Sequence, residues 1–413
     1  MGSFFSGWSK QSPLELVTLP KIKEAKDRIA SALPPTPLTL STGVSELSGR
    51  EIFFKWDNKF KTGSFKERGA TNALLQLAER EQSRGVCAAS AGNHAQALSF
   101  HARRLGIPCK LVMPVGAPLV KIERTRRNGA DVILEGNTLD DAYQYATELA
   151  RKEGLSFISP FDDAHIINGQ GCCGLEIVEQ LSAFDSIIVP IGGGGYISGI
   201  ATALKALKPE IFVLGVQSEW AESGRLGQHQ TGKLLAPSTI ADGIAVKRTG
   251  RLTQPIIDAR VDKVVSVSEQ LIARAIVSLL EIEHAVVEGA GAAPLAALLA
   301  GHLPEKYRRT VVCISGSNID MNVLQRLMER DMGERGRLLR VKVSVPDRPG
   351  SLNATAGILA RAGANILEVI HDRTCSELPG NVDIMMVMEV RNPDHSREVV
   401  QELQRCGVQS KPY

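Results

Sequence analysis

Between about residues 50 and 330, short apolar or β-branched runs alternate with longer amphipathic stretches. This alternation is typical of a parallel sheet covered by helices, because each buried strand is followed by a helix that crosses back over the sheet. The pattern therefore predicts an α/β fold. The runs that we expect to form strands are 52–54, 86–89, 109–113, 132–134, 186–189, 211–216 and 310–314.

A second pattern begins after the polar, glycine-containing stretch 331–337. We expect a linker there, which leaves a first domain at 1–330, with a smaller subdomain at roughly 60–160, and a separate module at 338–413. The periodicity of the module predicts the order β-α-β-β-α. A last short strand near Val408 would complete a ferredoxin-like α+β fold.

The composition is that of an ordinary globular protein, with 413 residues, 43% hydrophobic and 23% charged residues and a net charge of +3. No basic stripe indicates a nucleic-acid partner. No apolar run reaches the roughly 18 residues of a membrane span, and the first residues lack the apolar core of a leader. We therefore expect a cytoplasmic protein without nucleic-acid or membrane partners. The seven cysteines show neither zinc-site spacing nor the density of a disulfide scaffold.

Chemistry-bearing residues gather in segments that each follow an expected strand and precede an expected helix. Open α/β sheets bind ligands at this place, beyond the carboxyl ends of the strands. The segments are KTGSFKERGA at 61–70, SAGNHAQ at 90–96, PIGGGG at 190–195 and CISGSN at 313–318. Taken singly, each has an ordinary structural interpretation, such as a solvated helix lysine, a helix N-cap or a tight turn. Their coincidence indicates a site.

The glycine run 192–195 is suited to an anion, because glycines leave the backbone amides open and the following helix start adds a partial positive charge. It is not the GxGxxG dinucleotide motif, and no acidic residue follows at the expected distance. This difference counts against a hydride-transfer enzyme. A plain tight turn remains the alternative.

Together, SFKERGA and SAGNHAQ resemble motifs of the fold-type II pyridoxal-phosphate (PLP) enzymes, and most closely the threonine/serine dehydratase and serine racemase branch, over roughly residues 35–330. The resemblance implies two open, mostly parallel α/β subdomains and PLP as cofactor. It implies that Lys66 carries the cofactor and acts as general base. The other implied cofactor contacts are Phe65 on the ring face, Asn93 at the ring hydroxyl, Gly192, Gly193, Gly194 and Gly195 at the phosphate, and Ser315 at the pyridine nitrogen.

The substrate contacts are less closely specified. We expect Ser90, as a catalytic and binding residue, and the backbone around the following turn to hold the substrate carboxylate, because exposed amides at a helix start suit an anion. Asp242 is a candidate for orienting the leaving hydroxyl, with a turn or cap residue as an equal alternative. Glu288 lies in a segment that the family uses near the cofactor, but we assign it no role. The remaining residues of the turn are Ala91, Gly92, Asn93 and His94.

The implied reaction is loss of water and then ammonia from L-threonine or L-serine, giving 2-oxobutanoate or pyruvate. A neutral Ser315 at the pyridine nitrogen favours elimination over a long-lived carbanion. A serine racemase with side eliminase activity is one alternative, although that pattern has a serine where this chain has Ala91, and a methyl group delivers no proton. A catalytically silent amino-acid sensor is the other.

We expect no metal ion. Some relatives bind a divalent cation through acidic residues after the strand that corresponds to 211–216. Here Gln217 and Ser223 stand where carboxylates are expected, and a hard cation gains most from charged oxygen ligands.

The C-terminal segments VPDRPGSL at 345–352 and GANI at 363–366 resemble an ACT domain. The resemblance implies a site for a free amino-acid effector at a dimer interface, with a purely structural dimerisation module as the alternative. We expect a homodimer or homotetramer, since an exposed edge strand invites pairing. The implied effector residues are Asp347, Arg348, Gly350, Leu352 and Asn365.

The residues leave several points open. One methyl group in an apolar pocket changes substrate preference by only about 1–3 kcal/mol, so threonine and serine are not separated. The effector, and a biosynthetic role in supplying 2-oxobutanoate for isoleucine as against a catabolic role, also stay open.

Overall fold

The computed structural model describes residues 12–79, 84–221, 239–372 and 379–412. The chain forms two compact units, Met1–Ile319 and Asp320–Tyr413. The α/β fold and the C-terminal ferredoxin-like module predicted from the sequence are confirmed. No helix in the described ranges is long and apolar enough to cross a membrane.

The larger sheet of the first unit has six strands in the order β1-β2-β10-β7-β8-β9. β1 is antiparallel to β2, and the other pairs are parallel. The carboxyl ends of the parallel strands therefore meet at one edge, where open α/β sheets bind ligands. The strands are β1 (Leu38–Ser41), β2 (Glu51–Trp56), β10 (Arg309–Ile314), β7 (Ser186–Pro190), β8 (Phe212–Ser218) and β9 (Lys263–Val267).

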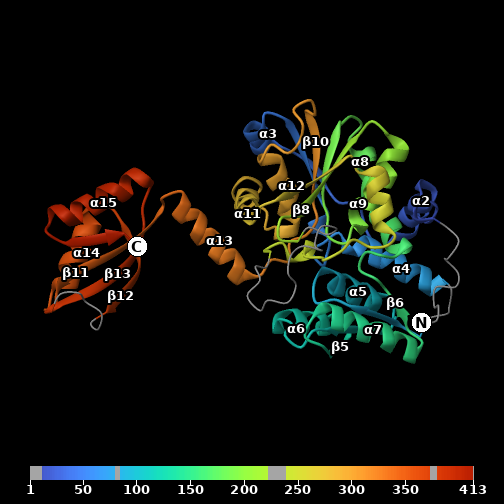
Figure 1. The fold of residues 1–413 in the computed structure, drawn as a ribbon, viewed down its shortest axis with the longest axis horizontal. Coiled ribbons are helices and arrows are strands. Elements are labelled where there is room, and N and C mark those ends of the chain that lie inside the picture. The colour runs from blue at the N-terminus through green and yellow to red at the C-terminus, as the bar shows by residue number, and fades with distance from the viewer. Residues whose placement is uncertain (1–11, 80–83, 222–238, 373–378, 413) are drawn as a thin grey trace. The chain divides into compact units, whose positions relative to one another are not determined.

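Helices cover both faces of this sheet (Figure 1). On one face, Ile187 and Val311 of the strands pack against Ile197 and Ile200 of α9, all fully buried. Each such side chain contributes about 1.5–3 kcal/mol through burial. The opposite face is covered by α12. The helices around the sheet are α1 (Pro13–Leu16), α2 (Leu19–Ile29), α3 (Thr42–Ser48), η1 (Asp57–Lys59), α8 (Ala164–Gln180), α9 (Gly195–Leu207), η2 (Asp242–Ile244), α10 (Thr253–Arg260), α11 (Glu269–Glu283) and α12 (Gly289–Leu299).

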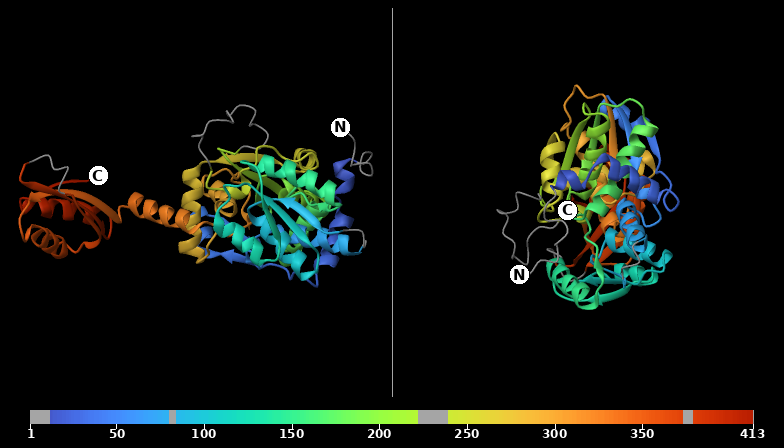
Figure 2. Two further views of the ribbon diagram at one scale, coloured as in Figure 1. Left: turned by 90° about the horizontal axis from the view of Figure 1, so that it is seen from below. Right: turned by 90° about the vertical axis from the view of Figure 1, so that its right-hand side faces the viewer.

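The smaller sheet has four parallel strands in the order β5-β4-β3-β6, drawn in cyan and teal in Figure 2. In β3, Val86 and Ala88 face α4 and α5, whereas Cys87 and Ala89 face α7. Small residues on both faces let the helices approach closely. The elements are α4 (Lys66–Glu79), β3 (Val86–Ala89), α5 (Asn93–Arg104), β4 (Cys109–Met113), α6 (Leu119–Arg127), β5 (Asp131–Leu134), α7 (Leu139–Glu153) and β6 (Ser156–Phe157).

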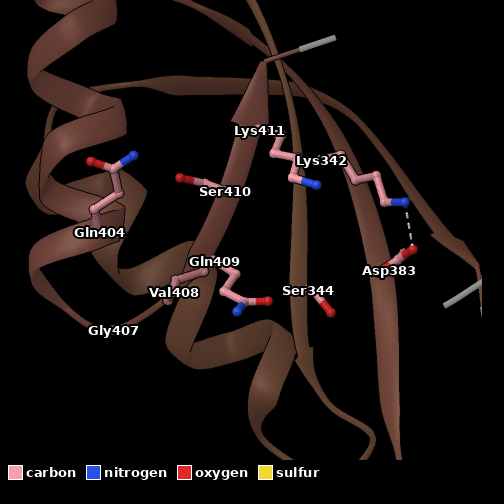
Figure 3. A pocket seen from close by; sticks show the side chains of 9 residues that line it. All are labelled: Lys342, Ser344, Asp383, Gln404, Gly407, Val408, Gln409, Ser410 and Lys411. Atoms are coloured by element: carbon pink, nitrogen blue, oxygen red, sulfur yellow. Dashed lines mark ion pairs between the residues drawn. The ribbon is translucent and has the colours of Figure 1, made fainter. Parts of the chain in front are cut away.

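The second unit has a four-stranded antiparallel sheet in the order β12-β13-β11-β14. Alternate apolar residues of β11 and β13, such as Val343 and Ile384, form its core with the helices. Beside β14 lies a cavity of about 630 Å³, where Lys342 and Asp383 form an ion pair of 2.8 Å (Figure 3). The elements are β11 (Leu338–Pro346), α14 (Ser351–Arg361), β12 (Asn365–Asp372), β13 (Asn381–Glu389), α15 (Pro393–Arg405) and β14 (Gln409–Pro412).

The junction between the units differs from the linker expected at 331–337. The helix α13 (Met321–Glu334) runs into that stretch, and the second unit begins at Asp320. Asp320 caps the helix by accepting from the Asn322 amide at 2.8 Å, and Arg330 pairs with Glu334 one turn on. Caps and pairs of this kind support a polar, exposed helix, which the composition alone made look like a loop.

Candidate active site

Two of the sequence segments lie side by side at the carboxyl end of β10. The Phe65 amide donates to the Ser315 carbonyl at 2.9 Å, and the Ser317 amide donates to the Gly63 carbonyl at 2.9 Å. Ser64 and Gly316 form an antiparallel bridge between them. These backbone contacts fix the start of α4 against the end of the central strand.

Lys66 is the first residue of α4 and is half-buried. Its Nζ donates to the Pro160 carbonyl at 2.7 Å and lies 5.0 Å from the centroid of the Phe65 ring. Burial lowers the pKa of Lys66 to about 8, although the nearby Glu288 acts in the opposite direction. Because a part of such an amine is uncharged near neutral pH, it is suited to forming an imine.

The Phe65 ring was expected to pack on a cofactor ring. It stacks on Tyr196 with 4.1 Å between ring centroids, and the Tyr196 hydroxyl donates to Asp57 at 2.8 Å. The orientation of Phe65 is thus set by a buried tyrosine from α9.

The glycine run forms a tight cradle between β7 and α9. Gly194 has a φ of 91°, which favours glycine, and it lies just ahead of the first residue of α9. A Cβ added at Gly193 would come within 2.2 Å of the Phe161 ring. The Gly193 carbonyl accepts from Thr253 Oγ1 at 2.6 Å. A side chain at Gly193 would therefore collide with the wall of the cradle.

The loop after β6 also contributes to the site, although no sequence motif predicted it. Pro160 receives the Lys66 hydrogen bond, and Phe161 lies against the glycine cradle. Asp162 holds the far side by accepting from the Leu252 amide at 2.7 Å and the Arg251 amide at 3.0 Å. A short loop of Ser, Pro and Asp carries no distinctive motif, so its contribution to the site could not be predicted from the sequence.

The turn between β3 and α5 was the expected carboxylate site. Ser90 Oγ accepts from the Gly92 amide at 3.2 Å, and α5 begins at Asn93. His94 is buried, and its Nε2 donates to the Ile158 carbonyl at 3.1 Å. Nδ1 has no hydrogen-bond partner among the described residues. Burial, together with the charge of Lys66, lowers the pKa of His94 to about 3, so its imidazole is neutral.

Glu288, to which no role was assigned, contacts this turn. Its carboxyl accepts from Asn93 Nδ2 at 2.7 Å and from the Asn318 amide at 3.0 Å. The Asn318 side chain donates in turn to Asn93 Oδ1. Burial and the charge of Asp242 raise the pKa of Glu288 to about 7.

Two further expectations concern single side chains. Asp242 begins η2, is 57% exposed and pairs with Lys121 of α6 at 2.9 Å. Its role in orienting the leaving hydroxyl stays a prediction. Ser317, next to the expected contact Ser315, donates to the Gly63 carbonyl at 3.2 Å. Ser315 is buried at the end of β10.

The stretch considered for a divalent cation is only partly described. Gln217 is buried, and Ser218 donates to Glu269 at 2.6 Å. Glu222 and Ser223 lie outside the described residues. Within the described ranges, no group of three or more His, Cys, Asp or Glu side chains is placed to hold a metal ion.

The expected effector residues lie in the second unit and are exposed. Gly350 has a φ of 94° and precedes α14, and the Asp347 amide donates to the Gly380 carbonyl at 2.9 Å. Asn365 begins the edge strand β12. The cavity of Figure 3 lies at the other edge, beside β14.

The residues of the first unit fit PLP. Lys66 supplies an amine of lowered pKa, and the glycine cradle at a helix start suits a phosphate. Ser64 Oγ and His94 Nδ1 are buried polar atoms without hydrogen-bond partners in the described part of the chain. These groups supply hydrogen-bond donors and acceptors that suit the phosphate and the polar ring of PLP.

Comparisons with known proteins agree with this interpretation. Residues 29–316 match the family described as pyridoxal-phosphate dependent enzyme, and residues 339–408 match the ACT domain. The chain is 44% identical over 387 residues to an L-threonine ammonia-lyase of Thermotoga maritima, covering 93% of this chain and 96% of that protein. Threonine deaminase isoform 2 from Solanum lycopersicum matches at TM-score 0.69 and 35% identity, covering 75% of this chain and 86% of that one. A serine racemase from Dictyostelium discoideum matches at TM-score 0.68 and 37% identity, covering 74% of this chain and 100% of that one. This chain belongs to the family of pyridoxal-phosphate dependent enzymes and carries a C-terminal ACT domain.

Proposed function

We propose that the protein is an L-threonine ammonia-lyase, which removes water and then ammonia from L-threonine to give 2-oxobutanoate, and converts L-serine to pyruvate. The observation that carries the proposal is Lys66, an amine of lowered pKa fixed by the Pro160 carbonyl beside the glycine cradle. The name of the Thermotoga relative, L-threonine ammonia-lyase, supports the same substrate, and this chain matches that protein over nearly its whole length.

PLP, when bound through Lys66, withdraws electrons from the substrate Cα and so acidifies its proton. The Lys66 amine would take that proton as general base. Ser90 and the amides at the start of α5 hold the substrate carboxylate. Asn93 would hold the ring hydroxyl, Gly192 to Gly195 would hold the phosphate, and the neutral Ser315 hydroxyl would meet the pyridine nitrogen.

Serine racemisation is the alternative that the solved structures bring forward, because a serine racemase is among the similar folds. A racemase needs a second proton carrier on the face of the substrate opposite Lys66. Ala91 offers a methyl group at the position where that pattern has a serine. Elimination is therefore the reaction that these residues favour.

The ACT domain supports regulation by a free amino acid in a homodimer or homotetramer. The edge strand β12 exposes Leu367, Val369 and Ile370, and an edge with apolar side chains invites pairing with a second copy. The effector would lie between copies, against Asp347, Arg348, Gly350, Leu352 and Asn365.

The test is 2-oxo acid release by the purified holoenzyme from L-threonine, L-serine and D-serine, with a chiral assay of the remaining serine. Rapid 2-oxobutanoate formation from L-threonine supports the proposal. Formation of D-serine faster than pyruvate would replace it with racemisation. Pure protein without cofactor absorbance and without turnover would indicate a silent sensor. Repeating the assay with each common amino acid added identifies an effector, and inhibition by isoleucine would favour a biosynthetic role.

A further inference from the structure

Glu288 stands at the N-cap position of α12 but does not cap that helix. Its side chain makes no capping hydrogen bond to α12 within the described structure. The carboxyl oxygens accept instead from Asn93 Nδ2 and the Asn318 amide, at 2.7 and 3.0 Å. The side chain is 3% exposed. A buried carboxyl that leaves its own helix start uncapped points to a function elsewhere.

The room that Glu288 occupies is kept open by glycines from two other segments. A Cβ at Gly316 would lie 2.2 Å from Glu288 Oε1, and a Cβ at Gly243 would lie 3.1 Å from the same atom. The Glu288 amide donates to the Gly316 carbonyl at 3.1 Å. The position of the carboxyl is therefore determined by the fold and not by a chance rotamer.

The two partners of Asn93 fix the orientation of its amide. Asn93 Oδ1 accepts from Asn318 Nδ2, and Asn93 Nδ2 donates to Glu288. Asn318 is itself held through donation to the Thr62 carbonyl at 3.0 Å. An asparagine amide has two N–H donors, so one N–H of Asn93 is left unassigned among the described residues. The part of the Asn93 amide that is left is thus an N–H donor. A ring oxygen of the cofactor accepts hydrogen bonds and requires such a donor.

We propose that Glu288 is a positioning residue of the cofactor site, which holds the Asn93 amide with one N–H free to donate to the ring oxygen of PLP and places a negative charge near the Lys66 nitrogen. The proposal rests on the role proposed above for Asn93, and it does not depend on the identity of the substrate. It assigns a function to a carboxyl that the elimination reaction does not itself use.

The charges around Glu288 support this assignment. Both carboxyl oxygens accept from N–H donors, which suits the ionised form. Burial and Asp242 raise the pKa of Glu288 to about 7, whereas Lys121 and the two donors act to lower it. Glu288 in turn raises the pKa of Lys66. Loss of the Glu288 charge below neutral pH should therefore weaken the hold on the cofactor and lower the pKa of the nitrogen at Lys66.

The first test is Glu288→Gln, which keeps the size of the side chain, removes the charge and replaces one acceptor with a donor. We would measure the PLP dissociation constant and the pH midpoint of the visible absorption change of the bound cofactor. We expect the dissociation constant to rise about tenfold or more, as loss of a charged hydrogen bond implies, and the midpoint to move to lower pH. Glu269→Gln is the matched control, because Glu269 is buried and accepts from Ser218 at 2.6 Å and the Ile240 amide at 2.7 Å, without contacting Asn93. It should leave both quantities unchanged.

The second test asks whether Glu288 acts through Asn93. In an Asn93→Ala background, Glu288→Gln should change PLP affinity by less than about twofold, because residues that act as a unit are not additive. Full additivity, or an E288Q protein with unchanged affinity and midpoint, would overturn the proposal. If E288Q does not fold, Asn318→Ala serves instead, since it frees the Asn93 amide but keeps the charge. It should weaken PLP binding without moving the midpoint, and unchanged binding would overturn the proposal.

These readouts separate the inference from the proposed substrate. A holoenzyme inactive on L-threonine, but with the predicted changes in PLP affinity and absorption, would contradict only the proposed reaction. An enzyme active on L-threonine in which E288Q binds PLP normally would contradict only the role of Glu288.

Discussion

Lys66 and Arg68 lie two residues apart at the start of α4, yet their surroundings differ. Nearby charges outweigh burial around Arg68, whereas burial outweighs nearby charges around Lys66. Arg68 is fully buried and bonds to both Asp57 and Glu176, at 2.8 and 2.5 Å. Burial alone would raise the pKa of Asp57, but the charge and hydrogen bonds of Arg68 lower it to about 2. In this cluster, opposite charges outweigh burial, and every group keeps its charge.

Around Lys66, burial outweighs the charges. It lowers the pKa of Lys66 to about 8 and that of His94 to about 3, and it raises that of Glu288 to about 7. Each group moves toward its neutral form, because the opposite charges nearby, such as Glu288 beside Lys66, act more weakly than the loss of water. Reactive sites need groups of this kind, whereas a structural ion cluster needs matched charges. The motif SFKERGA thus contributes both the reactive amine of Lys66 and the buried Arg68, whose ion cluster holds the start of α4 in place.

The sharpest test of the contrast is Lys66→Ala. Because we propose that Lys66 both carries the cofactor and takes the Cα proton, we expect 2-oxo acid release to fall by about 10²–10⁴-fold or more. Lys61→Ala is the matched control, since Lys61 lies five residues earlier and is exposed. An active K66A enzyme would remove Lys66 from the mechanism, whatever its pKa.

The second test breaks the balanced cluster with Arg68→Met. Removing one partner of a buried ion cluster costs about 3–5 kcal/mol, because the other charges stay buried without compensation. Urea unfolding of the apoprotein measures the loss. Arg127→Met, at a side chain that is 82% exposed, should change stability by less than about 0.5 kcal/mol.

The pH dependence of this variant gives an independent check. In the wild type, the pKa of Asp57 is lowered on folding, so its contribution is present above its unfolded pKa and is lost as the pH falls toward about 2. Without Arg68, burial raises the pKa of Asp57, and the destabilisation should ease as the pH falls from 7 to 5. A loss that does not change with pH would mean that Arg68 stabilises mainly by packing.

The sequence was sufficient to predict the strands and helices whose residues form a clear local pattern. The runs 86–89 and 109–113 were expected as strands and form β3 and β4, because continuous apolar stretches bounded by turns are typical of buried parallel strands. The last turn of α13, residues 331–334, was missed at the expected linker, because its sequence DMGE is polar and contains a glycine, as loops do.

The site was predictable only where residues lie within a motif. Lys66 and Asn93 stand in recognisable segments, but Asn93 meets Glu288 across 195 residues of chain. Pro160 and Lys66 are separated by 94 residues. Such pairs come together through the order of the strands, which a single sequence does not reveal residue by residue. The same limit applies to Glu176, which pairs with Arg68 across 108 residues of chain.

The third prediction concerns His94. Its pKa is lowered to about 3 on folding, so the neutral, buried form contributes stability above the unfolded pKa of about 6.5, and this contribution is lost as the pH falls. Between pH 7 and 5 we expect the wild-type apoprotein to lose about 1–2 kcal/mol more than His94→Gln. Parallel urea titrations at the two pH values measure the difference. Equal losses would mean that His94 is protonated in the folded protein and that its charge is compensated, as the charges around Arg68 are.

The smallest effect is expected at Asp242, whose ion pair with Lys121 is neither buried nor part of the Lys66 group. Exposed pairs contribute about 0–1 kcal/mol, so Asp242→Asn should alter the free energy of unfolding by less than about 1 kcal/mol, and less still in high salt. A residue on the surface should also leave kcat/KM for L-threonine within about tenfold of the wild type. Lys247→Met, which breaks the neighbouring exposed pair with Asp140, is the control. If D242N instead lowered kcat by about 100-fold at unchanged stability, Asp242 would orient the leaving hydroxyl, and an exposed, paired carboxylate would have to count among the reactive groups.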